Sequence, residues 1–212
     1  MGVKTFLANQ LRKPSGWFGR KIAGIFLNKA NSTLEDMGLK IMNIQPSSNI
    51  LEIGFGNGRL ISLMGNKLTS GKIVGIEISK EMIAAAKKKN QQLITSGKLT
   101  LIEASLDNIP AKDDSFDKVF TANTIYFWPS IDLNMQEIKR TIKPGGLFYC
   151  AIRAKSEMLQ QSVIRDNQDT FVNLFEKEEL KIFLEKSGFI NVKVQEEKGK
   201  PFTNIIVQGT KK

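Results

Sequence analysis

Short apolar runs alternate with helical patterns along most of this chain. From residue 79 to about 96, apolar positions recur on one helical face, Ser79 can cap the first turn and Gly97 can end the last. Alternating strands and helices predict a parallel sheet with helices on both of its faces. The runs that we interpret as buried strands are four to eight residues long and lie at 50–53, 72–78, 99–103, 116–122 and 146–153.

The first of these strands ends in a glycine-rich turn. The turn reads Gly54-Phe55-Gly56-Asn57-Gly58, and a helical pattern begins at Leu60. A strand, a glycine turn and a helix form a nucleotide-binding elbow, because glycine lets the backbone bend tightly and approach a ligand. The dinucleotide fingerprint is G-x-G-x-x-G, but here Arg59 stands where its third glycine would fall. The spacing therefore disfavours NAD and FAD.

The second strand ends near an acidic residue. Glu77 closes the run from Lys72 to Ile78. A carboxylate at such a strand end can accept hydrogen bonds from both hydroxyls of a ribose. The turn and the carboxylate together indicate a cofactor that contains a nucleoside.

The composition is that of an ordinary globular domain. The chain has 212 residues, of which 41% are hydrophobic and 25% charged, which excludes a disordered protein. The apolar stretches are too short to span a bilayer, and residues 1–20 lack the apolar core of a signal peptide. We expect one domain with a moderate extension, located in the cytoplasm.

The content of histidine and cysteine limits the chemistry. The sequence has no histidine and one cysteine, Cys150, which lies in an apolar run and is expected to be a buried thiol. Histidine, the commonest general base and metal ligand, is therefore absent, and we predict no metal site.

Positive charge is concentrated near the amino terminus. The net charge is +10, and residues 1–45 contain seven Lys or Arg against two acids. An acidic small molecule, a membrane surface or nucleic acid would each suit this segment. Scattered lysines that only keep the protein soluble explain the charge about as well.

Beyond the glycine turn and Glu77, three further segments resemble the class I S-adenosylmethionine-dependent methyltransferases. Ser115-Phe116-Asp117-Lys118-Val119 resembles the fourth strand of that family, and Asn123-Thr124-Ile125-Tyr126 resembles its substrate-side motif. Ile142-Lys143-Pro144-Gly145-Gly146 resembles the turn before its fifth strand. The segment from Arg12 to Asn31 is similar to the same region of small-molecule, quinone-biosynthesis-like (type 11) methyltransferases.

The resemblance implies the architecture. It predicts an α/β, Rossmann-like three-layer sandwich with a seven-stranded, mostly parallel sheet and an antiparallel carboxyl-terminal pair, 191–197 and 202–208, after a helix at 177–187. Residues 1–45 would form a helical cap or lid, in which Leu34, Met37, Ile41 and Ile44 share one face. Residues 46–212 would form the methyltransferase domain, whose insertion at 154–175 covers the active site.

The resemblance also implies the cofactor site, for S-adenosylmethionine and its product S-adenosylhomocysteine. Glu77 would bind the ribose, and the glycine turn would lie beside the methionine portion. An acid often follows the third strand in this family to bind the adenine amino group, but here Ser105 occupies that position. The predicted cofactor-binding residues are Glu52, Gly54, Phe55, Gly56, Gly58, Glu77, Ile78, Met82, Ser105, Leu106, Asn123 and Thr124.

The predicted substrate-side residues are mostly aromatic. Tyr126, Trp128, Trp17 and Phe18 would contact the acceptor, whereas we expect core packing for Phe127. Tyr126 could orient the substrate or, if its pKa were lowered, act as a base. Core packing or a simple helical cap explains the same residues without a substrate.

The predicted function is in-line methyl transfer to a small acceptor of acidic or apolar character, driven by positioning and desolvation. A nucleic-acid methyltransferase is disfavoured, because Asn123-Thr124-Ile125-Tyr126 departs from the Asn/Asp-Pro-Pro-Tyr pattern of base amino-methylating enzymes. A membrane-surface enzyme acting on a lipid or quinone precursor, and a cofactor-binding domain without turnover, remain open, as does the choice between monomer and homodimer.

Overall fold

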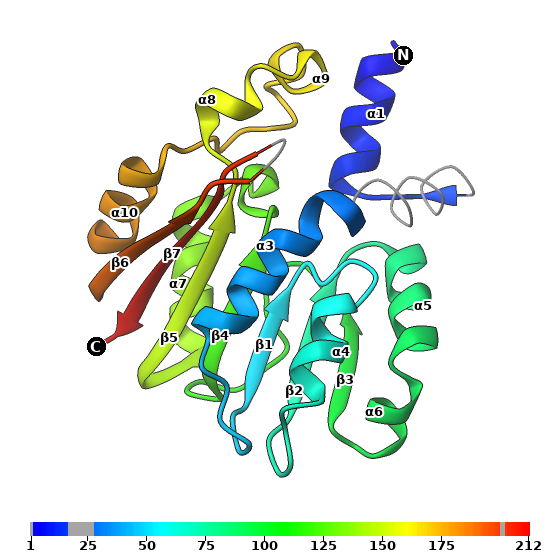
Figure 1. Ribbon diagram of the computed structural model, residues 1–212, viewed down its shortest axis with the longest axis vertical. Coiled ribbons are helices and arrows are strands. Elements are labelled where there is room, and N and C mark those ends of the chain that lie inside the picture. Colours follow the sequence, from blue (N-terminus) through cyan, green and yellow to red (C-terminus); the bar gives the residue numbers. More distant parts are fainter. Residues whose placement is uncertain (1, 17–27, 200–201) are drawn as a thin grey trace.

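The computed structural model describes residues 2–16, 28–199 and 202–212. In this part of the chain a single sheet has the strand order β3-β2-β1-β4-β5-β7-β6 (Figure 1). All neighbouring pairs are parallel except those of β7, which is antiparallel to both β5 and β6. The strands are β1 (Ile50–Ile53), β2 (Ile73–Glu77), β3 (Leu99–Glu103), β4 (Phe116–Ala122), β5 (Ile142–Ile152), β6 (Phe189–Glu197) and β7 (Asn204–Lys211).

Helices cover both faces of the sheet. Helices alternate with strands from β1 to β3, and the last helix precedes β6. They are α1 (Val3–Arg12), α3 (Asn28–Ile41), α4 (Arg59–Gly65), α5 (Lys80–Lys89), α6 (Gln91–Thr95), η2 (Ile125–Phe127), α7 (Ile131–Thr141), α8 (Lys155–Met158), α9 (Ser162–Arg165) and α10 (Lys177–Lys186).

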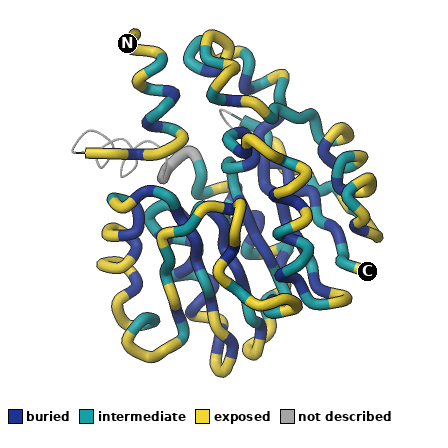
Figure 2. The backbone as a smooth tube through the Cα atoms, turned by 180° about the vertical axis from the view of Figure 1, so that it is seen from behind, coloured by how far each residue is buried: buried dark blue, intermediate teal, exposed yellow. Residues whose placement is uncertain are grey.

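The core consists of two hydrophobic clusters, one on each face of the sheet. Consecutive residues of β5 alternate between them: Phe148 and Cys150 pack with α7 and α10, whereas Tyr149 and Ala151 pack with α3, α4 and α5. All four are at most 1% exposed. Strands buried on both faces require continuous apolar runs, which explains why the sequence pattern identified them. Figure 2 shows the buried residues concentrated along the strands.

The order of the strands reverses between β1 and β4. From β1 the chain builds outward through β2 to β3, and from β4 it builds the opposite way through β5. The carboxyl ends of β1 and β4 therefore diverge into loops that leave a crevice, where open α/β sheets bind ligands. The glycine turn follows β1, and Asn123 follows β4.

The strand predictions agree with the structure to within a few residues, but one helix prediction was wrong. The expected helix over 79–96 is broken at Asn90, which separates α5 from α6. The Asn90 side chain donates to the carbonyls of Gly58 and Ala86 and thereby ties α5 to the glycine turn. The predicted cap and stop are present: Ser79 Oγ accepts from Met82 N, and Gly97 has a φ of +72°.

The carboxyl-terminal strands begin or end a few residues from their predicted bounds. β5 starts at Ile142 instead of Gly146, and a register shift against β4 lies between Phe116 and Lys118. β6 contains a second shift, between Ile190 and Lys193, where Asn191 has a φ of +53°.

The two described helices of the segment 1–45, which we expected to form a helical cap or lid, take different places. α3 packs on the sheet, where Leu34 and Met37 belong to the same cluster as α4. α1 instead stands above the carboxyl edge of the sheet beside α9 (Figure 1), and Lys4 of α1 forms an ion pair with Asp166 at 2.5 Å. No helix in the described ranges is long and apolar enough to cross a membrane.

One carboxylate lies inside this core. Glu52 of β1 is 5% exposed, and its Oε2 has no hydrogen-bond partner. Burial, followed by the nearby charges of Glu35 and Glu77, raises the pKa of Glu52 well above its ordinary value of 4.5. The side chain is therefore protonated in the folded protein well above that pH.

We predict that Gly58→Ala destabilises the protein more than Gly97→Ala. Both glycines have a φ of +72°, but a Cβ on Gly58 would lie 2.8 Å from Ala86 Cβ, whereas a Cβ on Gly97 would meet nothing within 4 Å. Left-handed strain alone should cost Gly97→Ala about 1–2 kcal/mol. Strain and overpacking together should cost Gly58→Ala about 2–5 kcal/mol. Urea unfolding measures both, and equal losses would contradict the packing of α5 against the turn.

A second prediction concerns Glu52→Gln and pH. A group whose pKa is raised by folding contributes stability below its unfolded value of 4.5, and this contribution is lost as the pH rises through the folded pKa. Glutamine keeps the neutral shape and does not titrate. The variant should therefore gain stability relative to wild type between pH 4.5 and pH 8 in urea unfolding, and a difference independent of pH would contradict the buried acid.

Candidate active site

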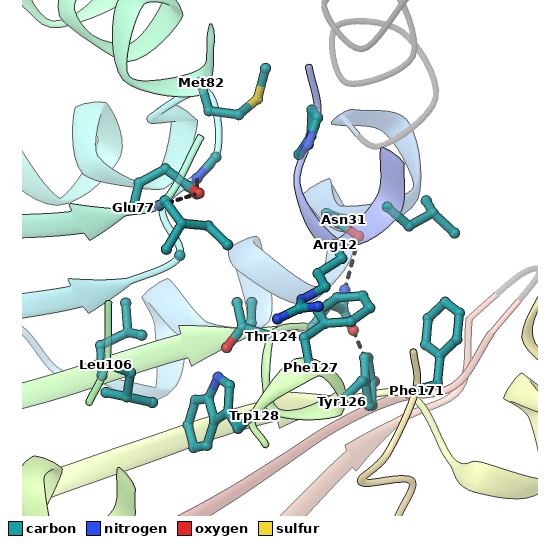
Figure 3. A pocket seen from close by; sticks show the side chains of 18 of the residues that line it. Arg12, Asn31, Glu77, Met82, Leu106, Thr124, Tyr126, Phe127, Trp128 and Phe171 are labelled. Atoms are coloured by element: carbon teal, nitrogen blue, oxygen red, sulfur yellow. Dashed lines mark hydrogen bonds between the residues drawn. The ribbon is translucent and has the colours of Figure 1, made fainter. Parts of the chain in front are cut away.

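A cavity of about 920 Å³ opens at the carboxyl edge of the sheet. Its wall comes from the loops after β1, β2, β3 and β4, and from α1 and the 154–175 segment. In Figure 3, Glu77 and Met82 lie at one end, and Tyr126, Phe127 and Phe171 lie at the other. The topology thus brings most of the predicted cofactor and substrate residues into one continuous space.

At the end of the cavity marked by Met82, Glu77 connects the turn after β1 with the turn after β2. Its Oε2 accepts from Gly56 N at 3.1 Å, and its Oε1 accepts from Ile78 N at 2.7 Å and from Ser79 N at 3.0 Å. Burial raises the pKa of Glu77, and these three backbone hydrogen bonds partly offset the effect. The carboxylate is held from both sides: Oε1 uses both of its lone pairs, and Oε2 keeps one for a further donor.

The glycine turn has the shape that a close-lying ligand needs. Gly54 and Gly56 have φ values of +67° and +54°, which side chains rarely adopt. A Cβ on Gly54 would lie 2.4 Å from Thr124 Cγ2, whereas nothing lies within 4 Å of a Cβ built on Gly56. Gly54 therefore lets the loop after β4 approach, and Gly56 exposes its backbone to the cavity. These features fit the methionine portion of S-adenosylmethionine.

Apolar and polar groups line the rest of this end. Ile78, Met82 and Leu106 form an apolar part of the wall. Met82 and Leu106 are buried residues whose remaining surface faces the cavity. Such a slot fits a flat purine ring. Ser105 also lines the cavity, as predicted, and next to it Asp107 supplies a carboxylate that the sequence interpretation missed.

Three predicted site residues of the described ranges are not found in the cavity wall, and two others lie outside those ranges. The Phe55 side chain packs into the core beside Gly75, Gly58 contacts α5, and Glu52 lies beneath the turn in β1. These three support the loop that carries Gly54 and Gly56. The other two, Trp17 and Phe18, lie outside the described residues.

A hydrogen-bonded chain crosses the floor between the two ends. Tyr126 Oη accepts from Arg153 N at 2.6 Å and donates to Asn123 Oδ1 at 3.1 Å. Asn123 Nδ2 in turn donates to Asn31 Oδ1 of α3 at 2.9 Å (Figure 3). Asn123 holds a φ of +56°, a conformation that clusters at functional sites.

This environment is the opposite of what a tyrosine base requires. Tyr126 is 2% exposed, and burial raises the pKa of its hydroxyl far above 10. The interpretation of Tyr126 as a base with a lowered pKa was therefore wrong. Its hydroxyl instead fixes the orientation of the Asn123 amide.

The second end of the cavity is apolar and aromatic. Trp128 lines this end. Phe127 packs against the core cluster, as expected, and also lines the cavity, with its ring centroid 5.1 Å from that of Phe171. Arg12 and Arg153 add positive charge. The Arg153 guanidinium is buried, donates to Thr203 O and Asn204 Oδ1, and lies 5.6 Å from the Phe202 ring centroid.

Several wall residues had no recognisable motif. Leu7 and Leu11 of α1 line the cavity, and their spacing of four residues was the available signal for a helix with an inward face. Asn31, Arg153 and Phe171 come from three distant segments, and only the fold brings them together.

Comparisons with known proteins agree with this geometry. A family model described as a methyltransferase domain matches residues 51–150. YrhH of Bacillus subtilis, named as a methyltransferase, is 30% identical over 162 residues, which cover 75% of this chain and 86% of that relative. Demethylmenaquinone methyltransferase of Oceanobacillus iheyensis is 32% identical over 113 residues, 53% of this chain, and the match spans 47% of the relative's length.

A solved structure shows the same fold. The SAM-dependent methyltransferase from Aquifex aeolicus superimposes with a TM-score of 0.66 at 18% identity, over 98% of both chains. The similarity to YrhH extends over most of both proteins, and the domain model covers the glycine turn, Glu77 and β4. This chain therefore belongs to the methyltransferase family.

Proposed function

We propose that the cavity binds S-adenosylmethionine at its glycine-turn end and a small apolar acceptor at its aromatic end. One observation supports this most: a single cavity joins the Gly56–Glu77 corner to the wall formed by Phe127, Trp128 and Phe171. Two substrates that exchange a methyl group must meet in such a space, with water excluded.

In this proposal Glu77 accepts a hydrogen bond from a ribose hydroxyl through Oε2, whose second lone pair is left by Gly56 N. Ile78, Met82 and Leu106 pack against the adenine, and Gly54 and Gly56 accommodate the methionine portion beside Asn123 and Thr124. When bound, the cofactor supplies an electrophilic methyl group on a positively charged sulfur. The protein then contributes alignment of the acceptor and removal of water, which can supply most of the acceleration.

The aromatic end favours an acceptor that loses its proton easily. In the described wall, the acids Glu77 and Asp107 belong to the cofactor end, and the Tyr126 hydroxyl is occupied by Arg153 N and Asn123 Oδ1. Arg12 and Arg153 stabilise negative charge on an acceptor and so lower its pKa. The acceptor oxygen or carbon would thus arrive ionised, and its proton would pass to solvent.

The names of relatives suggest an aromatic acceptor class. Several curated relatives are demethylmenaquinone methyltransferases, including one from Staphylococcus saprophyticus that is 28% identical over 74% of this chain and 76% of its own length. A hydroxylated aromatic ring with an apolar substituent would suit both the aromatic wall and the two arginines. We propose this class of compound as the acceptor.

We predict that Glu77→Gln weakens binding of S-adenosylhomocysteine about 10- to 100-fold, the loss of about 1–3 kcal/mol expected for a hydrogen-bonded carboxylate. The matched control is Glu103→Gln, since Glu103 pairs with Glu77 in register on β3 but does not line this cavity. Calorimetric titration measures both variants, with NAD as a ligand that should not bind. Unchanged affinity in a folded Glu77→Gln protein would refute the ribose contact.

We further predict that Val163→Trp blocks the acceptor end without affecting the cofactor end. Val163 of α9 lines the cavity and is half-buried, whereas Val172, which is 50% exposed, lies outside the wall and serves as the control for the same substitution. The added bulk should lower kcat/KM for the methylation of aromatic hydroxyl compounds about 5- to 100-fold. Affinity for S-adenosylhomocysteine should stay within about twofold of wild type.

The acceptor compounds for this assay come from a screen of radiolabelled methyl transfer with wild-type protein. Equal rates for Val163→Trp and Val172→Trp would place the acceptor elsewhere. A simultaneous loss of cofactor affinity in Val163→Trp would show that the two ends are not separate sites.

A further inference from the structure

We propose that the side-chain amide of Asn31 donates a hydrogen bond to the ionised hydroxyl oxygen of the acceptor and so orients the acceptor toward the methyl group. This inference rests on the function proposed above and names the residue that positions the reacting molecule. Asn31 belongs to α3 and lines the cavity. In the view of Figure 3, Asn31 and Arg12 lie between Glu77 on one side and Phe171 on the other.

The hydrogen bonds along the cavity floor can run in only one direction. Arg153 N is a backbone amide, so it must donate to Tyr126 Oη, which lies 2.6 Å away. Tyr126 then has one hydrogen to give, and Asn123 Oδ1 at 3.1 Å is closer than Arg153 O at 3.4 Å. Because its oxygen faces Tyr126, Asn123 presents Nδ2 to Asn31, whose Oδ1 accepts at 2.9 Å. The backbone amide thus determines the orientation of both side-chain amides.

This orientation leaves Asn31 with a donor to offer. Its oxygen is occupied by Asn123, so its NH₂ group is the part that remains for a ligand. Within the part of the chain that the structure describes, Asn31 Nδ2 forms no hydrogen bond. Asn31 is half-buried, and its Nδ2 is not among the buried polar atoms that lack a partner. The donor therefore keeps surface that a ligand can reach.

The helix that carries Asn31 is fixed to the glycine turn. Arg59, the first residue of α4, donates from Nη1 to Glu35 Oε2 and from Nη2 to Asp36 Oδ1, both at 2.7 Å. Leu34, one turn after Asn31, is fully buried against the sheet. A donor held in this way needs little reorganisation when a charged group binds to it.

The surroundings of Asn31 favour an ionised acceptor oxygen as its partner. Asn123 lies beside the place proposed for the methionine portion, so its neighbour Asn31 lies where the transferred methyl group and the acceptor would meet. Arg12 adds positive charge to the same wall. Hydrogen bonds to ionised oxygens are about twice as strong as those between neutral groups. A neutral amide orients such an oxygen and leaves its negative charge available for the attack on the methyl group.

The test uses 4-nitrophenol, an aromatic hydroxyl compound whose ionised form absorbs visible light. Absorbance against pH gives the pKa of the hydroxyl bound to the wild-type chain that is saturated with S-adenosylhomocysteine. This pKa should lie below that of the free probe, because Asn31 and the arginines stabilise the ionised form. Asn31→Asp keeps an oxygen for Asn123 Nδ2 but removes the donor. The pKa of the bound probe should then rise by about one pH unit or more, and the ionised probe should bind about 10- to 100-fold less tightly.

Two further variants separate the donor from the added charge. Asn31→Leu removes the amide without adding charge and should also raise the pKa of the bound probe. Asn66→Asp makes the charged substitution at an exposed residue outside the wall and should match wild type. All three variants should bind S-adenosylhomocysteine within about twofold of wild type in calorimetry. Thermal unfolding by circular dichroism checks that they fold.

Three results would overturn the role of Asn31. A wild-type pKa of the bound probe in Asn31→Leu would do so and leave the proposed function intact. So would weaker binding of S-adenosylhomocysteine, but not of 5′-methylthioadenosine, by the Asn31 variants, since the amide would then bind the carboxylate of the methionine portion. Absence of probe binding to the wild-type complex would overturn both this inference and the proposed acceptor class.

Discussion

The carboxylate of Glu77 connects the two turns on which the cofactor end of the cavity depends. By accepting from Gly56 N as well as from Ile78 N and Ser79 N, it joins the loop after β1 to the start of α5. Taking a carboxylate out of water is costly, and the raised pKa of Glu77 records that cost. The three backbone hydrogen bonds offset this cost in part. The same group is therefore structural and available for binding.

The sheet and the cofactor end could be predicted from the sequence because their physical causes are local. Strands buried on both faces need unbroken apolar runs, and the tight turn after Ile53 needs glycine at positive φ. The break between α5 and α6 could not be predicted, since the side chain that causes it, Asn90, bonds to Gly58 more than thirty residues away. A periodic pattern records which residues face the core, and it does not record such a contact.

The acceptor end was less predictable for the same reason. Asn31, Arg153 and Phe171 share no motif, and each reaches the cavity only because α3, the residue after β5 and the 154–175 segment converge there. Tyr126, Phe127 and Trp128 all line the cavity, but the environment of each depends on burial that the sequence does not show. Phe127 turned toward the cavity, and the environment of Tyr126 raised its pKa where a base would need it lowered. Residue type alone therefore predicted where these side chains lie better than it predicted what they do.

The shift of register in β6 has a consequence for solubility. Among the residues that the structure describes, β6 is the last strand of the sheet, and no strand of that part pairs with its outer edge. A long, flat, apolar edge would pair with edges of other molecules, but here Asn191 at positive φ bends the strand, and Lys193, Glu196 and Glu197 follow the bend. A charged and irregular edge is a poor template for another strand. The register shift in β6 thus disfavours edge-to-edge pairing of this sheet with a strand of another molecule.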